Sequence, residues 1–168
     1  MGVELPVLVE NPNPELPPAE RSDPDGSAGD DAVHADQPGL KLEPVGRDTW
    51  RSPAGLVWGP GPGQHRIQHV MRHCHDDPSR PVHGVFNVTH QDEVLGLIDQ
   101  AWQIAGTGAG DKVRKKQSGE RTEYTITMPQ TVGYVGGRQG GEQGQPQTDR
   151  IRLVTQGNRV ITAYPVWP

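Results

Sequence analysis

The prolines and the aromatic residues of this chain lie in different stretches, and this division decides where a hydrophobic core can form. Residues 1–48 contain eight of the 17 prolines and none of the eight Trp, Tyr and Phe residues. They also contain 11 Asp and Glu against three Lys and Arg. A segment this acidic and this poor in apolar side chains cannot bury enough surface to offset the entropy lost on ordering. We therefore predict a disordered acidic arm over residues 1–50 and one folded domain over residues 51–168.

The predicted domain has the opposite charge balance from the arm. Residues 49–168 contain 13 Lys and Arg against 10 Asp and Glu, so the acidic balance of the whole chain does not argue against an anionic partner. A length of roughly 115 residues supports one modest core. The arm is interpreted as a solubilising tail or linker. The alternative is that it mimics an anionic ligand and folds back onto a basic face.

Hydrophobic spacing predicts two helices in the first half of the domain. In segment 64–77, apolar residues recur with the i, i+3, i+4, i+7 spacing of one helix face, and Pro78 ends the segment. Segment 92–106 carries a longer apolar stripe that ends at a glycine. Thr89, with Asp92 three residues later, has the spacing of a capping box before this second helix. The apolar positions are Ile67, Val70, Met71 and Cys74 in the first helix and Val94, Leu97, Ile98, Ala101, Ile104 and Ala105 in the second.

The period of the pattern changes to that of strands after residue 120. The predicted strands occupy residues 121–128, 131–136, 149–155 and 158–166. The last two are joined at Gln156-Gly157, which is a strong hairpin signal. Segments 106–119 and 137–147 are predicted to be flexible or loops, and 81–88 is too short for more than one strand or turn. Helices followed by strands predict an α+β fold with a roughly four-stranded antiparallel sheet.

Histidines form the first group of candidate functional residues. His65, His69 and His73 are four residues apart and so share one face of a helix. Three imidazoles at this spacing could bind zinc, although no HExxH motif accompanies them. The alternative is a polar helix face with a single functional histidine.

Two pairs of residues near the C-terminus form the second group. Alternation along a strand places Arg150 and Arg152 on one face of the sheet, and it places Thr162 and Tyr164 together in the last strand. Arginines, a hydroxyl and a phenol around one histidine could bind a phosphodiester. Solvated strand edges and an ordinary sheet are the alternative interpretation of the same residues.

The sequence lacks the usual targeting signals, which predicts a protein of the cytoplasm. No segment approaches the roughly 18 apolar residues of a membrane span, and the first residues lack the basic and apolar regions of a secretory signal. The single cysteine, Cys74, excludes an intramolecular disulfide framework. We expect a cytoplasmic protein, with delivery or secretion by a non-classical route as the alternative.

Two sequence segments resemble a known family of toxin nucleases. QHRIQHV, near the start of the domain, and VITAYPV, at its end, are similar to the bacterial RNase A-like toxin domains of contact-dependent inhibition proteins and other polymorphic toxins. The wider group of small toxin nucleases, including EndoU-like ones, ends in a similar Tyr-Pro strand. The resemblance covers roughly residues 58–168 and implies an RNase A-like fold without disulfides. The segment DDPSRP departs from the family pattern, as does PVHGVFNV.

The resemblance also implies an activity, namely cleavage of RNA by attack of the ribose 2′-hydroxyl, without a metal ion or other cofactor. His69 matches the family's histidine and would act as the base, while Tyr164 or His83 would act as the acid. Arg80 matches its arginine and, with Arg66 as the alternative, would stabilise the charge on phosphorus. The remaining implied roles are phosphate binding by Thr162 and substrate binding by Arg66, His83, Arg150 and Arg152.

The expected partner is RNA, together with an immunity protein if the chain is a toxin, and neither DNA nor a membrane. Two other functions stay open, namely a non-catalytic binding or structural domain of the same fold and a metal-binding protein built on His65, His69 and His73. The enzyme hypothesis requires His69, Thr162 and Tyr164 to converge on one open cleft.

Overall fold

The computed structural model of the chain describes residues 40–168. Most of the predicted acidic arm, residues 1–39, therefore lies outside the described residues. Residues 43–51, which straddle the predicted boundary between arm and domain, form two short strands that belong to the main sheet.

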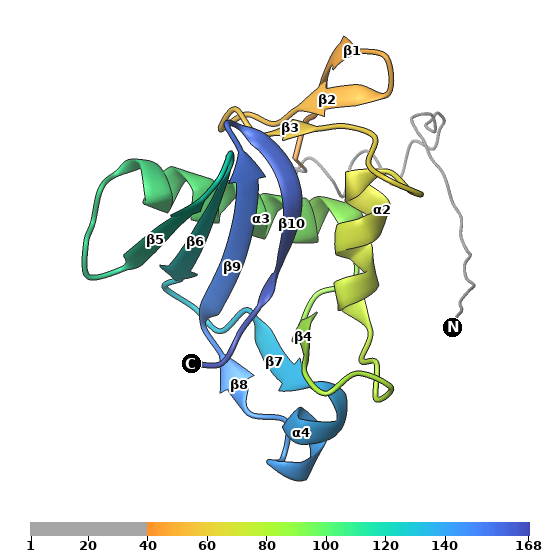
Figure 1. The fold of residues 1–168 in the computed structure, drawn as a ribbon, viewed down its shortest axis with the longest axis vertical. Coiled ribbons are helices and arrows are strands. Elements are labelled where there is room, and N and C mark those ends of the chain that lie inside the picture. The colour runs from red at the N-terminus through yellow and green to blue at the C-terminus, as the bar shows by residue number, and fades with distance from the viewer. Residues whose placement is uncertain (1–39) are drawn as a thin grey trace, which may run out of the picture. The chain divides into compact units, whose positions relative to one another are not determined.

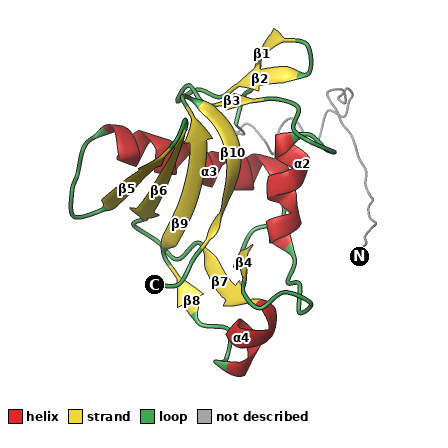
Figure 2. Ribbon diagram, viewed as in Figure 1, coloured by secondary structure: helices red, strands yellow, loops and turns green. Residues whose placement is uncertain are grey.

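Two sheets make up most of the described structure (Figures 1 and 2). A seven-stranded sheet has the order β1-β2-β3-β10-β9-β6-β5, and a three-stranded sheet has the order β4-β7-β8. Every pairing is antiparallel except that of β3 with β10. The strands are β1 (Glu43–Gly46), β2 (Thr49–Arg51), β3 (Val57–Trp58), β4 (His83–Phe86), β5 (Val113–Ser118), β6 (Arg121–Thr127), β7 (Gly133–Gly136), β8 (Gln147–Thr148), β9 (Arg150–Gln156) and β10 (Arg159–Pro165). The helices are α2 (Arg66–Met71), a 3-10 turn (Arg72–Cys74), α3 (Gln91–Gly106) and α4 (Gly137–Glu142).

The predicted fold, two N-terminal helices followed by a roughly four-stranded antiparallel sheet, is wrong. Three strands precede α2, and the main sheet is mixed and has seven strands. The strand β1 is exposed, and β2 and β3 have only three and two residues, so no apolar alternation marks these strands. The strand β5 consists largely of exposed cationic and polar residues. Such residues are typical of an edge strand, which polar and charged side chains protect from further pairing.

Helix α3 covers one face of the main sheet and closes the core (Figure 1). It confirms the second predicted helix, and Val94, Ile98 and Ala101 of the predicted stripe are fully buried. The predicted capping box is wrong. It requires Thr89 as the N-cap of the helix, whereas the N-cap is His90 and the helix begins at Gln91. The core also contains Trp58, which is fully buried.

Helix α2 begins where the spacing predicts but is shorter than the predicted segment 64–77. Its last turn tightens into the 3-10 turn, after which the chain is irregular. Ile67, Val70 and Cys74 face the core as predicted. The imidazole of His65 caps the helix by accepting a hydrogen bond from the backbone N–H of Ile67.

A bulge in β10 decides which of its residues face the core. Val160 pairs with Thr155, and the next paired residue is Thr162, so Ile161 is an extra residue in the strand. Its carbonyl oxygen accepts a hydrogen bond of 3.2 Å from the guanidinium of Arg66, which ties α2 to β10. The predicted hairpin of β9 and β10 is present, but its turn is Gly157-Asn158 and not Gln156-Gly157, because Gln156 pairs with Arg159. Among residues 40–168, no helix is long and apolar enough to cross a membrane.

Candidate functional site

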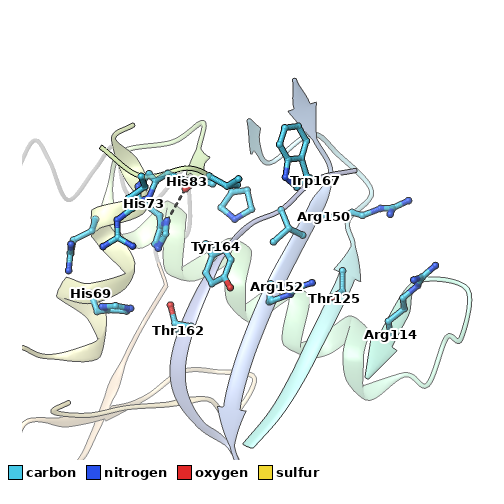
Figure 3. A pocket seen from close by; sticks show the side chains of 16 residues that line it. His69, His73, His83, Arg114, Thr125, Arg150, Arg152, Thr162, Tyr164 and Trp167 are labelled. Carbon is cyan, nitrogen blue, oxygen red and sulfur yellow. Dashed lines mark hydrogen bonds between the residues drawn. The ribbon is translucent and has the colours of Figure 1, made fainter. Parts of the chain in front are cut away.

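A cleft of about 730 Å³ lies on the face of the main sheet opposite α3, between the sheet, α2 and β4 (Figure 3). Its lining includes three histidines, five arginines, two threonines and a tyrosine, and no carboxylate among the described residues. The histidines are His69, His73 and His83, and the arginines are Arg72, Arg80, Arg114, Arg150 and Arg152. Such a lining is suited to an anion.

One row of paired residues forms the floor of the cleft. Tyr164 on β10 pairs with Arg152 on β9, Arg152 pairs with Thr125 on β6, and Thr125 pairs with Arg114 on β5. Directly paired residues of adjacent strands project to the same face of a sheet. The alternating positions in these strands, such as Leu153, are buried beneath α3. Strand alternation therefore separates the polar floor of the cleft from the core.

The imidazole of His73 lies between two other rings. It stacks on His83, with 4.5 Å between the ring centroids and 17° between the planes. On its other side it stacks on Tyr164, at 5.1 Å and 22°. His69, one helical turn earlier, approaches His73 edge-on at 6.5 Å. Residues from α2, the 3-10 turn, β4 and β10 thus meet in one aromatic cluster.

A close backbone approach makes this cluster possible. Gly84 on β4 lies so near to Pro165 on β10 that a Cβ at this position would collide with the Pro165 carbonyl oxygen. Only glycine avoids the collision, and β4 can therefore bring His83 beside His73. The backbone oxygen of Gly84 also accepts a hydrogen bond of 2.8 Å from His73 Nδ1.

Hydrogen bonds assign different tautomers to His73 and His69. Because a carbonyl oxygen can only accept, the bond to Gly84 places the proton of neutral His73 on Nδ1 and the lone pair on Nε2. His69 is reversed, since the side-chain amide of Gln64 donates to its Nδ1 over 3.2 Å. Neutral His69 therefore carries its proton on Nε2. One ring offers an acceptor and the other a donor.

Burial keeps the three histidines of the cleft neutral at neutral pH. Burial above all, together with the neighbouring His83, lowers the pKa of His73 to about 3, and the Gly84 hydrogen bond only partly opposes this shift. Burial also lowers the pKa of His69, and the cations of Arg72, Arg66 and Arg80 add to this effect. The pKa of His83 is lowered by burial as well. The positive charge of the cleft therefore comes from its arginines.

Two of these arginines have buried atoms without a hydrogen-bond partner. The Nε atoms of both Arg150 and Arg152 are buried and form no hydrogen bond. Arg152 Nε lies 3.8 Å from a carboxylate oxygen of Glu123, which is beyond hydrogen-bond range. Arg80, in contrast, is exposed and paired with Asp77 at 3.1 Å. A buried donor without a partner costs free energy, so an anion bound over β9 would stabilise both side chains.

Most residues predicted from the sequence converge on this cleft. The convergent ones are His69, Arg80, His83, Arg150, Arg152, Thr162 and Tyr164. Arg66 does not line it, because its guanidinium binds the carbonyl oxygen of Ile161 instead. His65 is also elsewhere, with Nε2 donating to the Asp48 carbonyl oxygen over 2.8 Å. Within residues 40–168, no group of three His, Cys, Asp or Glu side chains is placed to hold a metal ion.

Several residues of the cleft were not predicted as parts of this site from the sequence. His73 was considered only as a metal ligand, although it lies at the centre of the aromatic cluster. Arg114 belongs to a segment predicted to be flexible, and Thr125 and Trp167 carried no motif. The sequence does contain a signal for Arg114, because a cationic run before a turn and a strand, here Gly119 and β6, is typical of an edge strand.

Comparison with known proteins found no matching family model, no matching curated protein and no matching solved structure. The function proposed below therefore rests on the chemistry of the cleft.

Proposed function

We propose that this protein is an endoribonuclease that cleaves RNA by transphosphorylation. The observation that carries the proposal is the pair of histidines, His69 and His73, which lie 6.5 Å apart in a cleft lined by arginines, with Nε2 of neutral His73 left to accept a proton. Cleavage by this route needs one group that accepts a proton and another that donates one. It also needs positive charge around the phosphate, where negative charge develops.

In this mechanism His73 is the general base. Its Nε2 lone pair takes the proton of a ribose 2′-hydroxyl, and the 2′-oxygen forms a bond to the adjacent phosphorus. The Gly84 hydrogen bond supports this role, because it orients the ring and partly stabilises the protonated form. His73 thus takes the role of base that the sequence resemblance implies for His69.

His69 is the general acid. His69 donates in its imidazolium form: its Nε2 proton passes to the 5′-oxygen as the bond between phosphorus and that oxygen breaks, leaving neutral His69, a 2′,3′-cyclic phosphate and a free 5′-hydroxyl. The two rings lie 6.5 Å apart, so one phosphodiester can contact both. Afterwards His73 holds the proton that His69 has lost, which balances the reaction.

The remaining polar side chains of the cleft bind the phosphate. Arg152 lies beside Tyr164 on the floor and would stabilise the charge on the non-bridging oxygens. Thr162 and the Tyr164 phenol would donate hydrogen bonds to the same oxygens. The nucleophile is the 2′-hydroxyl, which DNA lacks, so the substrate is RNA.

An apolar rim completes the substrate site. Val82 and Trp167 both line the cleft, and they are two of the three large hydrophobic side chains that are exposed in residues 40–168. Trp167 is 36% exposed. An exposed indole beside a phosphate site provides a stacking surface for a nucleobase.

The experiment is cleavage of RNA in excess EDTA, with detection of 2′,3′-cyclic phosphate ends. Wild-type protein should produce them, and His73→Ala should lose about 10²- to 10⁴-fold in rate. His75→Ala is the matched control, because His75 is exposed and lies outside the cleft. Absence of cleavage with retained RNA binding would favour a non-catalytic binding domain. Cleavage that EDTA abolishes would contradict the mechanism.

The toxin role and the immunity partner stay predictions. The test of the toxin role is growth of a bacterial culture that expresses the chain. Growth should stop with the wild-type protein and continue with His73→Ala.

A further inference from the structure

A second, smaller cavity of about 280 Å³ adjoins the cleft on the side of the edge strand β5. Its charged lining residues are Asp111, Lys112, Arg114 and Arg150, and Thr125 and Thr127 add hydroxyls. Arg114, Thr125 and Arg150 line both spaces, so the two lie side by side. Figure 3 shows Arg114 and Arg150 on the side of the cleft away from the histidines.

The charge of this cavity is that of an anion site. The lining contains three cationic side chains and only one carboxylate, that of Asp111, which is exposed. The Arg150 Nε atom is buried without a hydrogen-bond partner. Lys112 and Arg114 are exposed, so they can move to meet a ligand. The two threonines flank the cations on the same face of β6 and can donate hydrogen bonds.

The distance across the sheet separates this cavity from the histidines. Arg114 and Arg152 occupy one row with β6 between their strands, so their Cα atoms are about 10 Å apart at the usual strand spacing. Tyr164, which stacks on His73, lies one strand further away. A phosphate bound between His69 and His73 therefore cannot also contact Lys112. Whatever fills the second cavity is a different group of the ligand.

We propose that the second cavity binds a phosphate of the RNA strand next to the one that is cleaved. This inference rests on the proposed ribonuclease function, which places the cleaved phosphate at the histidines. A single strand carries one phosphate for each nucleotide, and a groove of cations beside the reaction site follows its backbone. The cavity thus makes the enzyme prefer substrates with more than one phosphodiester.

The experiment uses short DNA oligonucleotides that contain one ribonucleotide. Only the ribose 2′-hydroxyl can attack, so its position defines which phosphate is cleaved. A dinucleotide with a single phosphodiester is compared with two trinucleotides that carry the additional phosphate on either side. For the wild type, kcat/KM of one trinucleotide should exceed that of the dinucleotide about three- to tenfold, and added salt should reduce this gain.

The test variant is Lys112→Ala, because Lys112 lines only the second cavity. It should remove most of the trinucleotide gain. It should also make the binding of an uncleavable all-deoxy trinucleotide less sensitive to salt. The steepness with which the logarithm of the association constant falls with the logarithm of salt concentration should decrease by about 0.7. Lys116→Ala is the matched control, since it also removes one lysine charge, from a position on β5 opposite Glu123 and outside both cavities. It should keep the gain.

The outcomes separate the two proposals. If the wild type cleaves the dinucleotide but neither trinucleotide is better, the second phosphate site is wrong and the ribonuclease stands. The site is also wrong if Lys112→Ala and Lys116→Ala reduce the gain equally, since that would be a general effect of charge. If no substrate containing a ribonucleotide is cleaved, the proposed function itself fails.

Discussion

His73 Nδ1 and the carbonyl oxygen of Gly84 are 2.8 Å apart, and this hydrogen bond joins the 3-10 turn after α2 to strand β4. It leaves Nε2 as the nitrogen of neutral His73 that can accept a proton. The same glycine permits the close contact between β4 and β10. The orientation of the proposed base and the packing of the cleft wall therefore depend on one residue.

Gly84→Ala should destabilise the fold and reduce RNA cleavage together, because the new methyl group would collide with the Pro165 carbonyl oxygen. We expect a loss of about 1–3 kcal/mol in the free energy of unfolding, measured by urea denaturation. Gly96→Ala is the control, since a Cβ on this glycine of α3 meets nothing within 4 Å. It should stabilise the protein by about 0.5–1 kcal/mol. If Gly84→Ala leaves the urea concentration at the midpoint of unfolding unchanged, β4 can move away from β10 at little cost in free energy.

The assignment of base and acid predicts different responses to the leaving group. His69→Ala should cleave RNA about 10²- to 10⁴-fold more slowly. It should recover most of this loss on a nucleoside 3′-(4-nitrophenyl) phosphate, whose leaving group needs no proton. His73→Ala should be slow on both substrates, because the 2′-hydroxyl must still be deprotonated. Kinetics of the two variants on the two substrates check the assignment, and the reverse pattern would exchange the roles of the two histidines.

Protein stability should fall on acidification before most carboxylates titrate. Unfolded His73 takes up a proton near its ordinary pKa of 6.5, while folded His73 stays neutral down to about pH 3. The unfolded state binds more protons between these values, so the free energy of unfolding decreases as the pH falls through them. His65, His69 and His83, whose pKa values are also lowered by burial, act in the same direction.

His73→Phe should weaken this dependence while preserving an aromatic ring between His83 and Tyr164. Removing the His73 imidazole should reduce the slope of the free energy of unfolding against pH by about 1.4 kcal/mol per pH unit between roughly pH 6 and pH 4.5. Urea denaturation of wild type and variant over this range measures the slope. Identical slopes would mean that His73 is protonated in the folded state.

Trp167→Ala should raise KM for RNA about fivefold to 100-fold, since stacking of one base on an aromatic ring contributes about 1–3 kcal/mol. The free energy of unfolding should barely change, because the indole is partly exposed at the end of the chain. Val45→Ala is a suitable comparison, as Val45 is an exposed hydrophobic residue on β1, outside the cleft. If both variants have the KM of the wild type, the base is bound elsewhere.

Local patterns predicted those parts of the fold that local interactions stabilise. Helix α3 and the β9–β10 hairpin each contain the apolar spacing or the turn that forms them. The strand β3 has only two residues and pairs with Arg159 and with β2, so distant partners stabilise it. No window of sequence around Val57 contains that information. This is why the predicted sheet had too few strands.

The site was predictable to the same extent. Strand alternation placed Arg150 with Arg152 and Thr162 with Tyr164, and all four residues line the cleft. The contact of His73 with His83 could not be predicted, because it depends on the approach of Gly84 to Pro165. Nor could the structural role of Arg66, since its acceptor is a carbonyl group at the β10 bulge.

The bulge at Ile161 has a consequence for changes in the length of the chain. Deletion of Ile161 would remove the extra residue of the bulge and leave a regular strand. In a regular strand Val160 still faces the core, and Thr162 and Tyr164 still face the cleft, because successive residues alternate between the two faces. Deletion of Ala163 would instead reverse Tyr164 and remove its ring from His73. A one-residue gap in this strand is therefore tolerable at Ile161 and damaging two residues later. Relatives of this chain that differ in length here should carry the gap at the bulge.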